Sequence, residues 1–145
     1  MALPSVLTIV DVAKSQLLDY NDKNFERMRA TVTPDFVYNE LGTGRKLQGI
    51  DQAVNAFRGW ATALPDSKGT IVNEVVSGNT VVLELTWNGT HTGPLETPNG
   101  RIAPTGRTIN LPACQVIEVA GDKVRSVRHY FDMASLLNQI GALPK

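Results

Sequence analysis

The stretch Thr80–Thr90 reads TVVLELTWNGT, and its odd-numbered positions are apolar from Val81 to Trp87. Because successive residues of a β-strand point to opposite faces of a sheet, these positions form one apolar face. Glu84 lies on the opposite face, which the pattern leaves to solvent. The stretch therefore predicts a strand of a sheet that is buried on one side only.

Similar stretches flank this strand and are rich in β-branched residues. They cover residues 71–76, 108–119 and 123–131. The sequences Ser77-Gly78-Asn79 and Gly121-Asp122 have the composition of turns, which predicts an antiparallel arrangement. Residues 92–107 are rich in Gly and Pro and interrupt the series. This segment is long enough to be a functional loop or a flap over a pocket.

The remaining residues carry helical patterns, with apolar side chains at spacings of three and four. The predicted elements are a helix over residues 6–20, a short helix over 24–31 with Asn24 as N-cap, a short strand at 36–38, a helix from the N-cap Asp51 to Leu64, and a last helix over 134–140 followed by Gly141. Helices that precede a run of strands indicate an α+β architecture. A length of 145 residues predicts one domain, residues 1–145.

The composition excludes several classes of function. Lys and Arg number 14, as do Asp and Glu, so the net charge is zero and gives no support for a nucleic-acid partner. Cys114 is the only cysteine, which rules out an intramolecular disulfide, and its apolar context predicts a small buried side chain. One cysteine and two histidines do not make a zinc site, so no metal is expected. Phosphate-loop, GxSxG and HExxH motifs are absent from the sequence.

The N-terminal segment is apolar but lacks the positive region of a signal peptide. No stretch approaches the ~20 apolar residues that a membrane span needs. These features predict a soluble, cytoplasmic protein without a membrane partner.

The strongest candidate for chemistry is the sequence RSVRHYFD, residues 125–132. Strand alternation places His129 on the same face as Val127 and Phe131, so its imidazole is predicted to point inward. An enclosed imidazole can exchange a proton near neutral pH, although it can equally be a core histidine that only bonds a neighbour. Asp132 can be the N-cap of the last helix, or a carboxylate that orients His129 or acts as a base, and the two roles can coexist.

Other residues are candidates for the walls of a pocket. Tyr38, Trp60 and Trp87 are predicted to line it, because Tyr and Trp often offer a polar end to a ligand. His91 ends a strand, where a histidine is usually a partly solvated hydrogen-bonding residue and less often a catalytic one. Glu118 and Arg128 are expected on the outer face of the sheet, which is exposed or forms a dimer contact.

Several segments together resemble the SnoaL-like (ester cyclase) family of the nuclear-transport-factor-like superfamily. They are residues 87–94, 104–107, 130–132, 136–137 and 139–141. The resemblance implies a cone-shaped α+β barrel, in which a bent antiparallel sheet wraps around helices and encloses an apolar pocket, and it implies a homodimer. Characterised members close a polyketide ring by an intramolecular aldol reaction without metal or cofactor. An aspartate is the base and a histidine stabilises the enolate.

Matching this chain to the family places His129 at the position of the aspartate and Gln115 at the position of the histidine. Asp132 follows three residues later. The resemblance thus implies a His/Asp pair in an altered arrangement, with His91 and Gln115 as polar groups of the pocket and Phe131 in its wall.

The leading hypothesis is a cofactor-independent enzyme that performs cyclisation or isomerisation on a small, apolar, carbonyl-bearing and polyketide-like molecule. His129 and Asp132 are its predicted proton-handling pair. Two alternatives stay open. The same pocket could bind a small molecule without chemistry, or Asp132, Arg128 and Glu84 could converge on a water molecule for epoxide hydrolysis.

Overall fold

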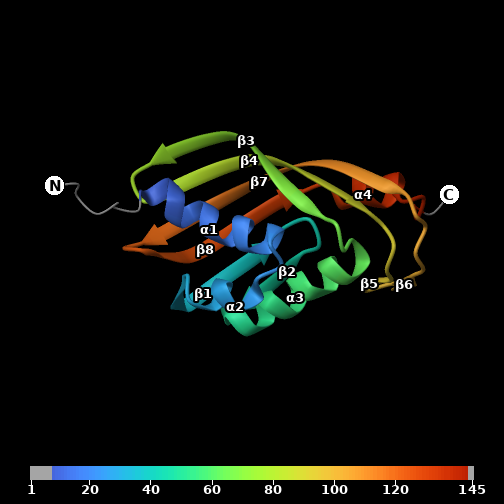
Figure 1. Ribbon diagram of the computed structural model, residues 1–145, viewed down its shortest axis with the longest axis horizontal. Coiled ribbons are helices and arrows are strands. Elements are labelled where there is room, and N and C mark those ends of the chain that lie inside the picture. The colour runs from blue at the N-terminus through green and yellow to red at the C-terminus, as the bar shows by residue number, and fades with distance from the viewer. Residues whose placement is uncertain (1–7, 144–145) are drawn as a thin grey trace.

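A computed structural model describes residues 8–143 and shows a curved six-stranded sheet packed against helices (Figure 1). The elements in chain order are α1 (Ile9–Asn21), α2 (Phe25–Arg29), β1 (Val32–Glu40), β2 (Arg45–Gln48), α3 (Gly49–Ala63), β3 (Lys68–Ser77), β4 (Thr80–Thr90), β5 (Leu95–Thr97), β6 (Gly100–Ile102), β7 (Thr108–Ala120), β8 (Lys123–Phe131) and α4 (Met133–Gln139). The predicted α+β class is confirmed. Within residues 8–143, no helix is both long and apolar enough to cross a membrane.

The strand order in the large sheet is β2-β1-β8-β7-β4-β3. Its neighbouring strands run antiparallel except β1 and β8, which pair in parallel. The expectation of a purely antiparallel sheet is therefore wrong at this one pair. These two strands are far apart in the sequence and no hairpin joins them, so no turn constrains their relative direction. In their register Glu40 lies opposite His129.

As predicted, alternate residues of the strand β4 lie on a buried face and on an outer face of the sheet. Val81, Leu83 and Leu85 of β4 are at most 2% exposed, whereas Glu84 is exposed and accepts a hydrogen bond of 2.9 Å from Asn73. The buried side chains form two apolar clusters. The main cluster lies between α1, α3 and the centre of the sheet. The end cluster contains Ala63, Leu64, Leu95, Ile109, Leu111, Leu136 and Ile140.

Three of the predicted helix termini can be compared with the structure. Asn24 caps α2 through a bond of 3.1 Å from the Arg27 amide, and Gly141 follows α4 with φ of 76°, so both predictions are confirmed. The predicted cap Asp51 is wrong, since α3 begins at Gly49, and Asp51 pairs with Arg29 instead.

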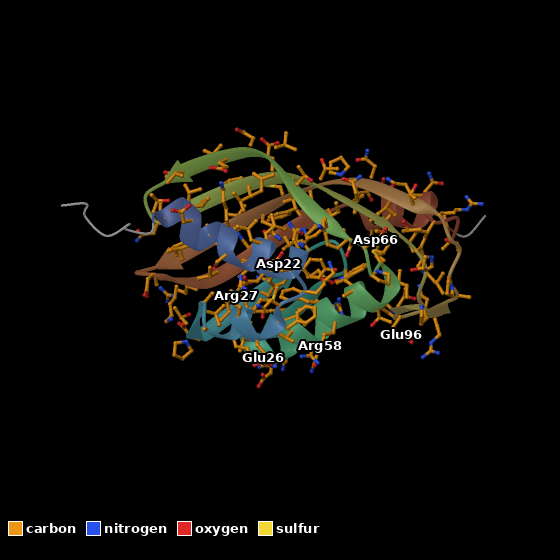
Figure 2. The ribbon with its side chains drawn as sticks, viewed as in Figure 1. Asp22, Glu26, Arg27, Arg58, Asp66 and Glu96 are labelled. Atoms are coloured by element: carbon orange, nitrogen blue, oxygen red, sulfur yellow. The ribbon has the colours of Figure 1, made fainter. Side chains whose placement is uncertain are left out.

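The start of the first helix also differs from the prediction. α1 begins at Ile9, where Thr8 and Asp11 form a capping box with bonds of 3.1 and 3.2 Å. The predicted start, Val6, lies outside the described residues. On α2 and α3, the charged side chains Glu26 and Arg58 are exposed on the helical side of the molecule (Figure 2).

Residues 92–107 are less irregular than predicted, because β5 and β6 form a hairpin that lies against the end of α3 (Figure 1). Gly93 allows this close approach: a Cβ atom on it would lie 1.9 Å from the Thr62 carbonyl oxygen. Leu95 is 5% exposed and belongs to the end cluster. Glu96, on the outer side of the hairpin (Figure 2), accepts a bond of 2.6 Å from Arg101.

Candidate functional site

A cavity lies where the main and end clusters meet, between the sheet and α1 and α3. Most of its lining is aliphatic or aromatic, and its polar side chains other than the tyrosines are Gln16, Glu40, Ser67, Gln115 and His129. The cavity has a volume of about 80 Å³, which is room for several water molecules. Typical ligand pockets have ~300–1,000 Å³. A ligand with several rings therefore requires side chains to move.

Glu40 is the acidic group of this cavity and was not among the residues predicted from the sequence. Its side chain ends β1 and is only 2% exposed. Oε1 accepts bonds from Arg45 Nε at 2.9 Å and Arg45 Nη2 at 2.7 Å, and a further bond from Thr43. Oε2 accepts one bond of 2.9 Å from Trp60 Nε1. Because a carboxylate oxygen can accept two hydrogen bonds, Oε2 retains capacity for a molecule in the cavity.

A signal for Glu40 was present in the sequence. Phe36, Tyr38 and Glu40 occupy alternate positions of FVYNE, so a strand extended by two residues places all three on one face. The predicted strand stopped at Tyr38.

His129 is also buried, at 6% exposure, and lines the cavity as predicted. Trp87 Nε1 lies 3.1 Å from its Nε2, and Tyr38 Oη lies 2.8 Å from its Nδ1. Since an indole N–H can only donate, Nε2 must be the acceptor, and the neutral ring carries its proton on Nδ1 and donates it to Tyr38. Burial lowers the pKa of His129 to about 4, although the nearby Glu40 charge opposes this shift. The ring is therefore neutral at pH 7.

Tyr38 is the hydrogen-bond partner of the imidazole on the strand that carries the acid. It lies two residues before Glu40 on the same buried face of β1. Burial, and after it the charge of Glu40, raise the pKa of Tyr38 well above 10, against a smaller opposing effect of a bond with Gln115. The phenol thus keeps its proton and can donate a hydrogen bond. Gln115 lies opposite His129 in the β7–β8 register and also lines the cavity.

The structure does not bring Asp132 together with His129. Asp132 is exposed and does not line the cavity. Its carboxylate caps α4 by accepting bonds of 3.0 Å from the Ala134 amide and 3.3 Å from the Ser135 amide. The capping alternative is confirmed, and the carboxylate near His129 in the cavity is that of Glu40.

His91 also lies outside the cavity lining. It is 1% exposed, which contradicts the partly solvated position predicted for it. Its Nδ1 lies 3.0 Å from Thr105 Oγ1 and accepts a bond of 3.3 Å from the Thr105 amide, so it ties the 92–107 segment to β4. Burial lowers the pKa of His91. By contrast, Trp60, Trp87 and Phe131 do line the cavity, as predicted.

The residues considered for epoxide hydrolysis do not converge. Arg128 lies 3.6 Å from Glu118 on the outer face of the sheet, Glu84 is exposed on the same face, and Asp132 caps α4. Cys114 is half-buried rather than buried, and it borders a surface groove beside Tyr130. Within residues 8–143, no three His, Cys, Asp or Glu side chains are grouped so as to hold a metal ion.

The fold and the site define a class of small α+β domains in which a curved sheet and helices enclose a mostly apolar cavity with a few polar side chains. The model of the SnoaL-like polyketide cyclase family matches residues 11–140, and this chain belongs to that family. The resemblance inferred from the sequence is therefore confirmed. No match was found among curated proteins.

Solved structures with the same fold share about a fifth of their residues with this chain. A putative SnoaL-like polyketide cyclase from Jannaschia sp. CCS1 has a TM-score of 0.82 and 22% identity, over 94% of this chain and 93% of that one. IdmH, a putative polyketide cyclase from Streptomyces antibioticus, has a TM-score of 0.79 and 20% identity, over 93% of this chain and 99% of that one. AclR, a putative hydroxylase from Streptomyces galilaeus, has a TM-score of 0.79 and 19% identity, over 94% of this chain and 87% of that one.

Proposed function

We propose that this protein catalyses proton transfer at a carbon atom next to a carbonyl group, without a cofactor, on a small and largely apolar substrate. The observation that carries the proposal is the Glu40 carboxylate, which is 2% exposed and lines the cavity. Arg45 supplies the compensating charge from a side chain that is 45% exposed. A fixed carboxylate with a free acceptor position on Oε2 is placed to act as a general base.

The first step is deprotonation of the substrate. Glu40 Oε2 takes a proton from the carbon next to the carbonyl, and the electron pair of the broken C–H bond moves to the carbonyl oxygen, which forms an enolate. The Tyr38 hydroxyl donates a hydrogen bond to that oxygen and stabilises the developing charge. In an isomerisation, Glu40 then returns the proton to another carbon. In a cyclisation, the enolate carbon attacks a second carbonyl group of the same molecule.

His129 is a positioning residue in this mechanism. Both of its ring nitrogens have partners in the chain, and a pKa of about 4 makes it a weak base. Its Nδ1–H group donates to Tyr38 Oη, which orients the phenol so that its own proton is available to a substrate. We therefore propose Glu40 in place of Asp132 as the partner of His129.

The substrate class follows from the family and from the cavity. The family is named for polyketide cyclases, and two of the similar structures are putative polyketide cyclases. Trp60, Trp87 and Phe131 give the cavity aromatic walls that suit a planar ring. We propose a polyketide-like molecule with at least one carbonyl group as the substrate.

Hydrogen exchange tests this proposal directly. The protein is incubated with 1-indanone in D₂O, and loss of the C2 proton signal is followed by NMR. We expect wild type to accelerate exchange and Glu40→Gln to abolish the acceleration. The matched control is Glu84→Gln, on the outer face, which should behave as wild type. Exchange at the buffer rate with wild type, or full acceleration by Glu40→Gln, would contradict the proposal.

A second candidate function is binding without chemistry. The observation that favours it is the completeness of the network: Glu40, Tyr38 and His129 all have partners within the chain before any ligand arrives. Under this alternative, 1-indanone raises the melting temperature but its C2 protons exchange at the buffer rate. The same samples therefore distinguish the two functions.

The predicted homodimer also stays a proposal. Tyr130 and Leu41 are 45% and 46% exposed and border one surface groove together with Pro112 and Cys114. Exposed apolar side chains of this kind suit a contact between two copies. Light scattering of wild type and Tyr130→Asp tests it: we expect a dimer for wild type and a monomer for the variant.

A further inference from the structure

Gln16 is a polar side chain of the cavity that has no partner among residues 8–143. It lies on α1, is 7% exposed and lines the cavity. Both of its side-chain polar atoms, Oε1 and Nε2, are buried without a hydrogen bond. Among residues 8–143, Asp19 Oδ2 and His91 Nε2 are also buried and unpartnered, but neither of these residues lines the cavity.

Four other polar side chains of the cavity, Glu40, His129, Tyr20 and Ser67, differ from Gln16 in this respect. Glu40 and His129 are bonded as described above, and the Tyr20 hydroxyl lies 2.6 Å from Ser67 Oγ. A buried polar group left without a partner is costly, and such groups are rare in native proteins. A leucine of similar size would avoid this cost. No group among residues 8–143 satisfies the carboxamide, so a water molecule in the cavity, or a ligand group that displaces it, must do so.

The chemistry of the carboxamide indicates what that partner is. Gln offers an acceptor in Oε1 and two donors on Nε2. A hydroxyl group can donate to the first or accept from the second, and the cavity has room for a water molecule to serve the remaining atom. A site with an unpaired buried polar group strongly disfavours an analogue that lacks the matching group.

We propose that Gln16 is a specificity-determining residue, which selects a hydroxylated ligand over the same ligand without the hydroxyl group. This inference rests on the proposed function only in that the carbonyl end of the ligand lies toward Glu40 and Tyr38. The ligand then carries two polar groups, a carbonyl bound from β1 and a hydroxyl bound from α1, separated by an apolar ring.

The test compares 1-indanone with 4-, 5- and 6-hydroxy-1-indanone, which place the hydroxyl group at different points of the ring. Dissociation constants are measured by calorimetry for wild type, Gln16→Leu and the control Gln48→Leu, whose side chain is exposed. We expect one hydroxylated isomer to bind wild type and the control about tenfold more tightly than 1-indanone, as one hydrogen bond provides. In Gln16→Leu this advantage disappears, while 1-indanone binds at least as well as to wild type.

A second measurement requires no ligand. Urea unfolding of Gln16→Leu should give a midpoint equal to or higher than that of wild type, because an unpaired amide is removed. A clear loss of stability would assign Gln16 a structural role and overturn the inference. So would a hydroxyl advantage that is absent from wild type or retained in Gln16→Leu, or a wild type that binds none of the four compounds. Exchange at C2 of 1-indanone is compared between wild type and Glu40→Gln, so it reports separately on the proposed function.

Discussion

Glu40 and His129 face each other across β1 and β8, at the same level of the parallel strand pair. The amide of the next residue, Leu41, donates a hydrogen bond of 2.8 Å to the His129 carbonyl, which fixes this register. Each side chain is then held by an indole: Trp60 donates to Glu40 and Trp87 donates to His129. The acid and the imidazole are therefore immobilised from both the strands and the cavity walls.

The buried imidazole makes stability depend on pH. In the unfolded chain His129 takes up a proton near its ordinary pKa of 6.5, whereas in the folded protein its pKa is about 4. The unfolded state therefore binds more protons between these values, and stability present above pH 6.5 is lost as the pH falls to 4. The difference corresponds to about 3 kcal/mol. Urea unfolding at pH 7 and pH 4 should show this extra loss in wild type relative to His129→Gln. An equal loss in both proteins would show that His129 is not the cause.

The phenol of Tyr38 should matter for catalysis as well as for folding, because it also accepts the bond from the buried His129 Nδ1–H group. Tyr38→Phe removes the proposed donor to the enolate oxygen but keeps the aromatic packing against Phe57, whose ring centre lies 4.9 Å away. Removal of one such donor costs about 100-fold in rate. We expect exchange at C2 of 1-indanone to slow by this factor. A rate within a factor of two of wild type would remove Tyr38 from the mechanism.

Asp132 should matter for stability and not for catalysis. Asp132→Ala removes the cap of α4, which is expected to cost about 1 kcal/mol in unfolding free energy. Asp132→Asn keeps a capping side chain and should recover most of that loss. Both variants should exchange 1-indanone at the wild-type rate. A strong loss of exchange in Asp132→Asn would restore the pairing of Asp132 with His129.

Two glycines provide a matched test of packing at the cavity wall. A Cβ atom on Gly42 would lie 2.4 Å from the ring of Phe131, so Gly42→Ala must displace that ring and should destabilise the protein by about 1–3 kcal/mol. Gly59 lies in α3 with no atom within 4 Å of such a Cβ, so Gly59→Ala should stabilise it by about 0.5–1 kcal/mol. Chemical denaturation measures both. Equal effects of the two substitutions would contradict the contact with Phe131.

Local patterns in the sequence were sufficient for much of the fold. The alternation in β4 and the caps at Asn24 and Asp132 depend on neighbouring residues only, and the structure confirms them. The parallel pairing of β1 with β8 was not predicted, because two strands separated by about 90 residues leave no local signal of their register. The β5–β6 hairpin was missed for another reason: its strands have three residues each, too few to show alternation.

The site was harder to predict than the fold. The inward position of His129 followed from alternation with Val127. Glu40 was missed because a charged residue at a strand end is usually exposed. Its burial depends on Arg45 and Trp60, which belong to other elements and reach it only in the folded chain. The unpaired amide of Gln16 likewise has no signature in the sequence.

The position of β8 between β1 and β7 also bears on how the protein is made. During synthesis, β1 leaves the ribosome well before β8, the strand that separates β1 from β7 in the sheet. Until it inserts, the two halves of the sheet cannot join, and contacts between residues so distant in sequence form slowly. The pairing of Glu40 with His129 and the completed sheet therefore form in the same step, once β8 has been synthesised.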